Sequence, residues 1–461
     1  MTRPIPVLSD YDMSPNHGFL PPETPLSVLP DPYYAEWEAI VADLPSLLVA
    51  KKLRQEIDQL PVLSTDYLKT PAEWRRASVC LTFMLHAYVF GEKEPRARIP
   101  PPLTVPLLSV SAYLELPPIG VYAAVNLWNY RPIDQNLTCS RPEDMEAGCT
   151  FTGSLDERWF YQISIAIEGN AASTIPLMLD AIAAARAGDG IKVTECLRTL
   201  AKGLQEMIDI LKRMPEGCDP HVFYHHLRHF LAGSQSIGGL VYDDGTGKEE
   251  DRRAYLGMSN AQSSLVVFFD LVLGISHSRS SKGDKSFFSN MRGYMPGNHR
   301  RFLEHIAEIA NIRTFVEERS DHQDLLAAYN TCLEIMGSMR DVHIRIVARY
   351  IMTQSLKNDK IDGQGLCSCD KNTSAPRTES PYIAPEKKTR KGLGGTDLIP
   401  FLSRVRTGTR ESKMSPLAAG TLKSKNQQMA LGASTWLQYI LAFAVGVAAL
   451  FFCKWSTIWD L

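Results

Sequence analysis

The chain has 461 residues, of which 44% are hydrophobic and 22% are charged, as in an ordinary soluble globular protein. Its formal net charge of −2 argues against a nucleic-acid-binding protein, because domains of that class are usually strongly basic. The nine cysteines are scattered and form no Cys-x-x-Cys pair, so they indicate neither a zinc ribbon nor a disulfide framework. Reduced thiols in a cytosolic compartment are the simplest interpretation.

The first part of the chain is predicted to be helical after a proline-rich arm at 1–31. Apolar residues recur at helical spacing from Trp37 to Leu48, and the run from Trp74 to Phe90 is a stronger helical candidate. The sequence Ile99-Pro-Pro-Pro interrupts this pattern. Further helices are expected at 104–115 and 118–130, and the turn-rich segment 131–153 is the best domain boundary.

The second part shows the same 3.6-residue period. Helices are predicted at 157–187 with a break near Pro176, and at 190–214, 220–231, 260–275, 298–309 and 322–355. No alternating strand pairs or βαβ units emerge, so we expect an all-α fold. The predicted order is an arm at 1–31, a small helical domain at 32–150, a larger helical domain at 151–405 with a mobile loop at 356–392, and a linker at 406–435.

The segment from Trp436 to Cys453 holds eighteen residues without a charge. As a helix it would span about 27 Å, close to the hydrocarbon thickness of a bilayer. Trp436 lies at one edge and Trp455 at the other, as interfacial aromatic residues do. This pattern predicts a C-terminal transmembrane helix at 436–453 that anchors the body on the cytosolic face of a membrane. The alternative is a buried terminal helix, which usually keeps one polar face.

The familiar phosphate-loop, GxGxxG, GxSxG and HExxH signatures are missing from the sequence. A haem enzyme needs none of them, because a neutral imidazole on a rigid element and a large apolar cavity suffice. His343 fits this requirement, since it lies late in the predicted 322–355 helix and shares a face with Met339 and Ile346. From spacing alone, a core histidine bonded to a backbone carbonyl is the commoner outcome.

A second group of histidines consists of His221, His225, His226 and His229, and the pairs His221/His225 and His225/His229 have the four-residue spacing that suits a shared metal. No carboxylate or cysteine clearly completes such a site. The same segment carries Phe223 and Arg228, and a glycine-rich loop follows it. An arginine beside aromatic rings suits a planar substrate with a carboxylate, although a surface salt bridge is the commoner fate of an arginine.

Several sequence blocks together resemble the indoleamine 2,3-dioxygenase family over roughly residues 15–405. These blocks are Leu116-Pro-Pro-Ile-Gly-Val-Tyr-Ala, Phe230-Leu-Ala-Gly, Gly239-Leu-Val-Tyr, Gln262-Ser-Ser, Phe269-Asp-Leu-Val-Leu-Gly, Tyr294-Met-Pro-Gly-Asn-His-Arg-Arg-Phe-Leu, Ser338-Met-Arg-Asp-Val-His and Gly394-Gly-Thr-Asp-Leu. The resemblance implies a haem-dependent dioxygenase that cleaves the indole C2–C3 bond of L-tryptophan, or of a related indoleamine, with O2. The product would be N-formylkynurenine, and the reaction would be the first step of the kynurenine pathway toward NAD.

The resemblance also implies roles for individual residues. His343 would be the proximal iron ligand of one haem b per chain, with Arg340, Asp270 and Ser259 also at the cofactor. Phe223 would lie against the indole, and Arg228 would bind the substrate carboxylate. The remaining pocket positions implied are Phe160, Tyr122, Val125 and Leu393, with Ser164 as an optional catalytic residue.

Three positions depart from the family pattern. Met258 and Asn260 are bulkier than the residues usual before Gln262, and Leu393 replaces a hydroxyl residue that commonly holds the substrate's ammonium group. Two alternatives therefore stay open: a haem-binding homologue or sensor without turnover, and a membrane-tethered helical scaffold whose histidines are core residues. We expect a monomer.

Overall fold

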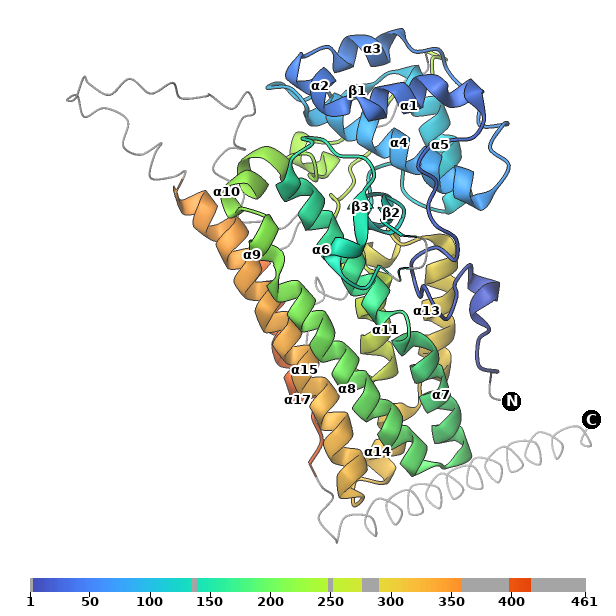
Figure 1. Cartoon of the computed structure of the whole chain (residues 1–461), viewed down its shortest axis with the longest axis vertical. Coiled ribbons are helices and arrows are strands. Elements are labelled where there is room, and N and C mark those ends of the chain that lie inside the picture. The colour runs from blue at the N-terminus through green and yellow to red at the C-terminus, as the bar shows by residue number, and fades with distance from the viewer. Residues whose placement is uncertain are drawn as a thin grey trace, which may run out of the picture.

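The computed structural model describes residues 3–134, 137, 139–247, 252–275, 290–357 and 398–415. Within these residues the protein is mostly helical, as the sequence predicts (Figure 1). Four short strands qualify the all-α expectation. β1 (Arg98–Ile99) pairs in parallel with β4 (Val241–Tyr242), and β2 (Tyr130–Pro132) pairs antiparallel with β3 (Met145–Ala147). Strands of two or three residues are too short to produce a recognisable alternation in sequence.

The N-terminal group of helices surrounds one buried helix, α4 (Pro71–Phe90). Thr70 caps its start by accepting a hydrogen bond from the Glu73 amide at 3.3 Å, and Pro71 occupies the first helical position. The helix is apolar on most of its faces, as expected for a helix covered on all sides. Its neighbours are α1 (Ala35–Ala42), α2 (Leu44–Val49), α3 (Leu53–Gln59) and α5 (Pro101–Leu114).

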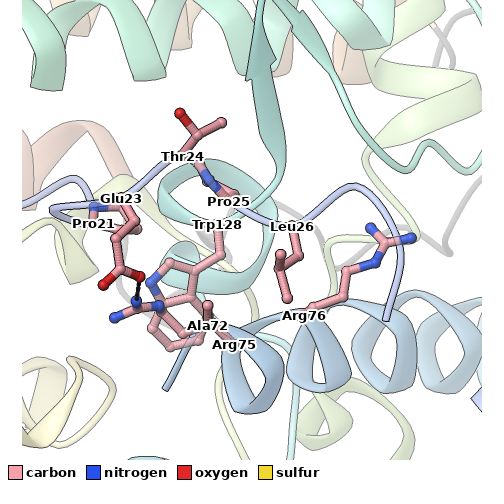
Figure 2. Close-up of a pocket in the computed structure, with 9 residues that line it drawn as sticks. All are labelled: Pro21, Glu23, Thr24, Pro25, Leu26, Ala72, Arg75, Arg76 and Trp128. Carbon is pink, nitrogen blue, oxygen red and sulfur yellow. Dashed lines mark ion pairs between the residues drawn. The ribbon is translucent and has the colours of Figure 1, made fainter. Parts of the chain in front are cut away.

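The N-terminal arm contains the 3-10 turn η1 (Leu8–Tyr11), passes over α4 and leads into the 3-10 turn η2 (Pro32–Tyr34). Figure 2 shows where Pro21 to Leu26 cross this helix above Trp128. Arg75 of α4 pairs with Asp12 at 2.5 Å and with Glu23 at 3.5 Å. These ion pairs fasten the arm to the small helical group.

The second group consists of longer helices, of which α8 (Gly190–Lys212) and α15 (Gln323–Val347) lie side by side (Figure 1). A stripe of buried apolar residues that includes Val193, Leu197, Leu200 and Leu204 faces the core from α8. The other elements are α6 (Leu155–Ala171), α7 (Thr174–Ala187), α9 (Met214–Gly217), α10 (Pro220–Val222), α11 (Ser264–Val272), α13 (Gly297–Ile309), α14 (Ile312–Glu318), α17 (Leu398–Glu411) and the 3-10 turns η4 (Pro142–Asp144), η6 (Ser234–Ile237) and η7 (Asn260–Gln262).

Two predicted helices are replaced by shorter elements. The segment 118–130 forms only the π-helical turn η3 (Ala123–Leu127) before β2, and 220–231 forms α10 followed by the π-helical turn η5 (Phe223–Leu227). A third π-helical turn, η8 (Ala348–Met352), extends α15. The predicted break near Pro176 lies between α6 and α7, and Pro176 itself is in the first turn of α7, where its missing N–H has no helical partner to lose.

No helix within the described ranges is both long and apolar enough to cross a membrane. The predicted span 436–453 lies outside those ranges, as does the part of the predicted mobile loop beyond residue 357.

Candidate active site

His343 lies one turn before the end of α15 and is half-buried. Neither of its ring nitrogens forms a hydrogen bond with any residue that the structure describes. Burial, and then the positive charge of Arg340, lower the pKa of the imidazole. A neutral imidazole with an available nitrogen is the form that binds a metal. The alternative of a core histidine bonded to a backbone carbonyl has no support among the described residues.

The predicted pair Arg340 and Asp270 is brought together one turn from His343. The Arg340 guanidinium donates to both Asp270 oxygens, at 2.6 and 2.8 Å, and also to the Val405 carbonyl at 3.4 Å. Arg340 is 9% exposed, so this charge-assisted pair is largely shielded from water. Three elements, α11, α15 and α17, are therefore joined beside the histidine.

A second set of ion pairs between α15 and α17 was not expected from the sequence. Asp341 accepts from Arg406 at 3.0 Å and from Arg410 at 2.6 Å. Both arginines belong to α17, which continues to Glu411 although the segment from 406 was predicted to be a linker. Arg406 and Arg410 are four residues apart, so they lie on one face of this helix and reach the same carboxylate.

The predicted substrate-pocket aromatic residues also come together. The Phe160 ring of α6 lies 5.0 Å from the Phe223 ring, and Tyr350 of η8 lies 5.7 Å from Phe223 on another side. Phe223 begins the turn η5, and the Arg228 amide closes this turn on the Phe223 carbonyl at 2.8 Å. A wide turn of this kind, with an i→i+5 hydrogen bond, brings residues five apart toward one face.

Arg228 is only 6% exposed, and burial lowers the pKa of its guanidinium. A buried arginine is costly unless an anion or good acceptors surround it. The Arg228 guanidinium lies over the Tyr224 ring, 5.6 Å from the ring centre. Ser164, one turn after Phe160 on α6, is also buried and polar.

Tyr122 precedes η3 and is tied to a buried carboxyl group that sequence reasoning missed. Its hydroxyl donates to Glu168 Oε1 at 3.0 Å, and the Ser263 hydroxyl donates to the same oxygen at 2.8 Å. Glu168 Oε2 is buried and has no partner among the described residues. Burial raises the pKa of Glu168 to about 7, against the opposing effect of the two hydroxyl donors. The only sequence signal was an acidic residue directly after the mostly apolar 163–167 stretch of α6.

The departures from the family pattern have distinct surroundings. Met258 is buried, and its sulfur lies 2.9 Å from where a Cβ on Gly120 would stand, so it fills space that a side chain at 120 would otherwise use. Asn260 is exposed. The Ser259 hydroxyl accepts from the Ala261 amide at 3.3 Å, which caps η7. Leu393 lies outside the described residues.

The histidine group on α10 and η5 does not form a metal site among the described residues. The His221 and His225 rings are 4.3 Å apart, but no cluster of three or more potential ligands exists in this part of the chain. A hollow of about 370 Å³ lies elsewhere, between the N-terminal arm, α4 and α13, and none of the predicted site residues lines it.

These features define a helical protein with a neutral imidazole on one helix, and with aromatic rings and a buried arginine brought together on neighbouring elements. The sequence model of the family described as Indoleamine 2,3-dioxygenase matches residues 7–412. The chain is 37% identical to an indoleamine 2,3-dioxygenase of Aspergillus nanangensis over 425 residues, which cover 89% of this chain and 98% of that relative.

Two further relatives extend this likeness. An indoleamine 2,3-dioxygenase of Saccharomyces cerevisiae is 37% identical over 428 residues, covering 88% of this chain and 94% of its own. A 6-hydroxytryptophan 2,3-dioxygenase of Fusarium equiseti is 36% identical over 415 residues, covering 88% and 97%. The chain therefore belongs to the indoleamine 2,3-dioxygenase family and is an enzyme of that family, whose members are haem enzymes.

Proposed function

We propose that this protein binds haem b and uses O2 to cleave the indole C2–C3 bond of L-tryptophan, giving N-formylkynurenine and supplying the kynurenine pathway toward NAD. The observation that carries the proposal is the His343 imidazole, which is neutral, half-buried and without a hydrogen bond to any described residue. A porphyrin iron is the partner that such a ring fits in a family of haem enzymes.

The proximal side of the proposed site is held by the chain's own ion pairs. His343 would hold the haem, which supplies the oxygen chemistry when bound. The Arg340–Asp270 pair fixes the α15 turn that carries this histidine. Because Arg340 also lies near the ring, its charge favours the neutral imidazole over the imidazolium.

On the substrate side the proposal assigns orientation and water exclusion to the protein. Phe223 and Phe160 would hold the indole between them and the cofactor, and Arg228 would bind the substrate carboxylate. Ser164 and Tyr122 would complete the wall. In this proposal no side chain acts as a base toward the indole nitrogen.

L-Tryptophan is the proposed substrate because most of the similar proteins are named indoleamine 2,3-dioxygenases. One relative is named for 6-hydroxytryptophan, so a substituted indole is the natural second substrate to compare. We further propose a cytosolic enzyme attached to a membrane through the 436–453 segment.

A direct test combines spectra with product analysis. Purified protein should show a haem Soret band and, under reducing conditions, should convert L-tryptophan and O2 to N-formylkynurenine. A Soret band without product would indicate a haem-binding homologue lacking turnover, and a colourless protein would exclude haem binding.

The Arg228→Ala variant tests the substrate side. Loss of a buried charge-assisted hydrogen bond costs roughly 1.5–3 kcal/mol, so KM for L-tryptophan should rise about tenfold or more. Arg319→Ala is the matched control. Arg319 directly follows α14 and lies over the Phe315 ring of that helix at 4.0 Å, away from the pocket residues. Normal tryptophan binding by Arg228→Ala would show that Arg228 is wrongly assigned.

A further inference from the structure

His86 lies in the buried middle of α4 and is fully enclosed. Both of its ring nitrogens are hydrogen-bonded to backbone groups. Nδ1 lies 2.7 Å from the Phe230 carbonyl oxygen, and the Gly120 amide donates to Nε2 at 2.9 Å. A carbonyl oxygen only accepts and an amide N–H only donates, so the proton is on Nδ1 and the ring has a single tautomer. Burial lowers the pKa of His86 to about 4, so the ring stays neutral.

The two backbone groups that His86 joins belong to two of the segments that supply the proposed pocket. Phe230 follows Arg228 by two residues, and Gly120 precedes Tyr122 by two residues. Gly120 and Phe230 are 110 residues apart in sequence (230 − 120). One ring on a buried helix therefore sets the spacing between them.

The surroundings of the bridge leave it little room to move. A Cβ on Gly120 would stand 2.5 Å from His86 Nε2 and 2.9 Å from the Met258 sulfur, so only glycine fits there. The Phe230 side chain is fully buried and stacks on Phe151, with ring centroids 4.6 Å apart and planes within 1°. The hydrogen bond from His86 and the stacking on Phe151 together hold Phe230 in place.

We propose that His86 is a positioning residue of the substrate pocket, which holds the Arg228 segment and the Tyr122 segment at the separation that tryptophan binding requires. This inference rests on the proposed function, and specifically on Arg228 and Tyr122 lining the pocket. His86 itself touches neither substrate nor haem. Its loss should therefore alter substrate binding while leaving the cofactor in place.

The test compares His86→Leu with His86→Gln in the full-length holoenzyme. Leucine removes both hydrogen bonds, whereas the glutamine amide can donate from Nε2 to the Phe230 carbonyl and accept at Oε1 from the Gly120 amide. We expect His86→Leu to raise KM for L-tryptophan about tenfold or more with a smaller change in kcat and an unchanged Soret band. His86→Gln should recover most of the wild-type KM.

His305 supplies a matched control in another part of the fold. It is 5% exposed, and both ring nitrogens are hydrogen-bonded, to the Tyr11 hydroxyl at 2.6 Å and to the Pro4 carbonyl at 2.9 Å. His305→Leu should lower stability without the change in KM. Gly120→Ala forces the His86 ring away and should raise KM as His86→Leu does. If His86→Leu does not fold, Gly120→Ala tests the positioning role in its place.

The proposal is overturned if His86→Leu, or Gly120→Ala in its place, keeps the wild-type KM, or if His305→Leu raises KM by the same factor. It is also overturned if His86→Gln folds, retains haem and shows no recovery of KM. The wild-type assay separates this outcome from failure of the proposed function. If the wild type turns over tryptophan and Arg228→Ala raises KM, an unchanged KM in His86→Leu contradicts only the positioning role of His86. The proposed function would then stand.

Discussion

The chemical state of His343 is set by its neighbours. Burial disfavours the imidazolium, and Arg340 adds a positive charge one turn away, so both effects lower the pKa of the ring. Asp270 pairs with Arg340 and keeps that guanidinium in place. The neutral form that a metal requires is therefore a consequence of how α11 and α15 pack.

Glu168 allows a test of stability against pH. Its pKa is raised from 4.5 to about 7 in the folded protein, so the folded state binds the proton more tightly than the unfolded chain. Its stabilising contribution is full below about pH 4.5 and is lost as the pH rises through about 7. Glu168→Gln keeps an acceptor for Tyr122 and Ser263 but cannot ionise.

Urea unfolding midpoints at about pH 5 and about pH 8 check this expectation. The wild type should lose stability relative to Glu168→Gln at the higher pH, because only the wild type must bury or protonate a carboxylate. Other titrating groups are shared by both proteins and cancel in the difference. An identical difference at both pH values would show that the Glu168 carboxyl is not held neutral.

Sequence reasoning reached some residues of the site and missed others for identifiable reasons. Spacing placed Met339 and Ile346 on the face of His343, but only the resemblance to the family raised this histidine above the commoner core role. The ion pair beside it depends on Asp270 of α11, which is distant in sequence. Glu168 and His86 were missed because each has its partners in other elements.

At the scale of elements, long and strongly patterned helices were predicted well and short ones were not. α8 and the start of α15 lie within a residue or two of the expected bounds, because each repeats its apolar stripe over several turns. The turn η5 escaped prediction because a 3.6-residue period does not describe it. Its backbone hydrogen bond joins the Arg228 amide to the Phe223 carbonyl, so the turn links these two predicted pocket residues.

The contact between α15 and α17 gives an element-scale prediction. Asp341→Asn weakens the ion pairs to Arg406 and Arg410 and should loosen the turn that carries His343. Partly exposed ion pairs contribute about 1 kcal/mol, so haem should transfer to an acceptor apoprotein about fivefold faster. Lys413→Gln, which removes the ion pair between Glu334 of α15 and Lys413 just beyond the end of α17, is the control and should leave the rate unchanged. Equal rates for wild type and Asp341→Asn would show that α17 does not support the haem side.

For the molecule as a whole, distant parts of the sequence are joined by a shared core and by specific polar contacts. β1 and β4 pair across the two groups of helices, and the N-terminal arm binds α4 through Arg75. His86 adds a buried connection between α4 and the pocket segments. The proposed pocket therefore depends on both groups of helices.

The proposed membrane attachment is tested by cell fractionation. The full chain should sediment with membranes and be released by detergent, because the uncharged segment 436–453 matches the bilayer in length. A chain ending at residue 415 retains the described body and should stay in the supernatant with its activity. Recovery of both forms in the supernatant would contradict the anchor.

The most direct test of the account is haem content in the His343→Ala variant, measured as the pyridine haemochrome alongside the far-ultraviolet spectrum. The wild type should carry about one haem per chain, and the variant should remain helical but bind almost none, because an alanine offers iron no ligand. A variant that keeps a full complement of haem and still opens the indole ring would contradict the assignment of His343 and the site built around it.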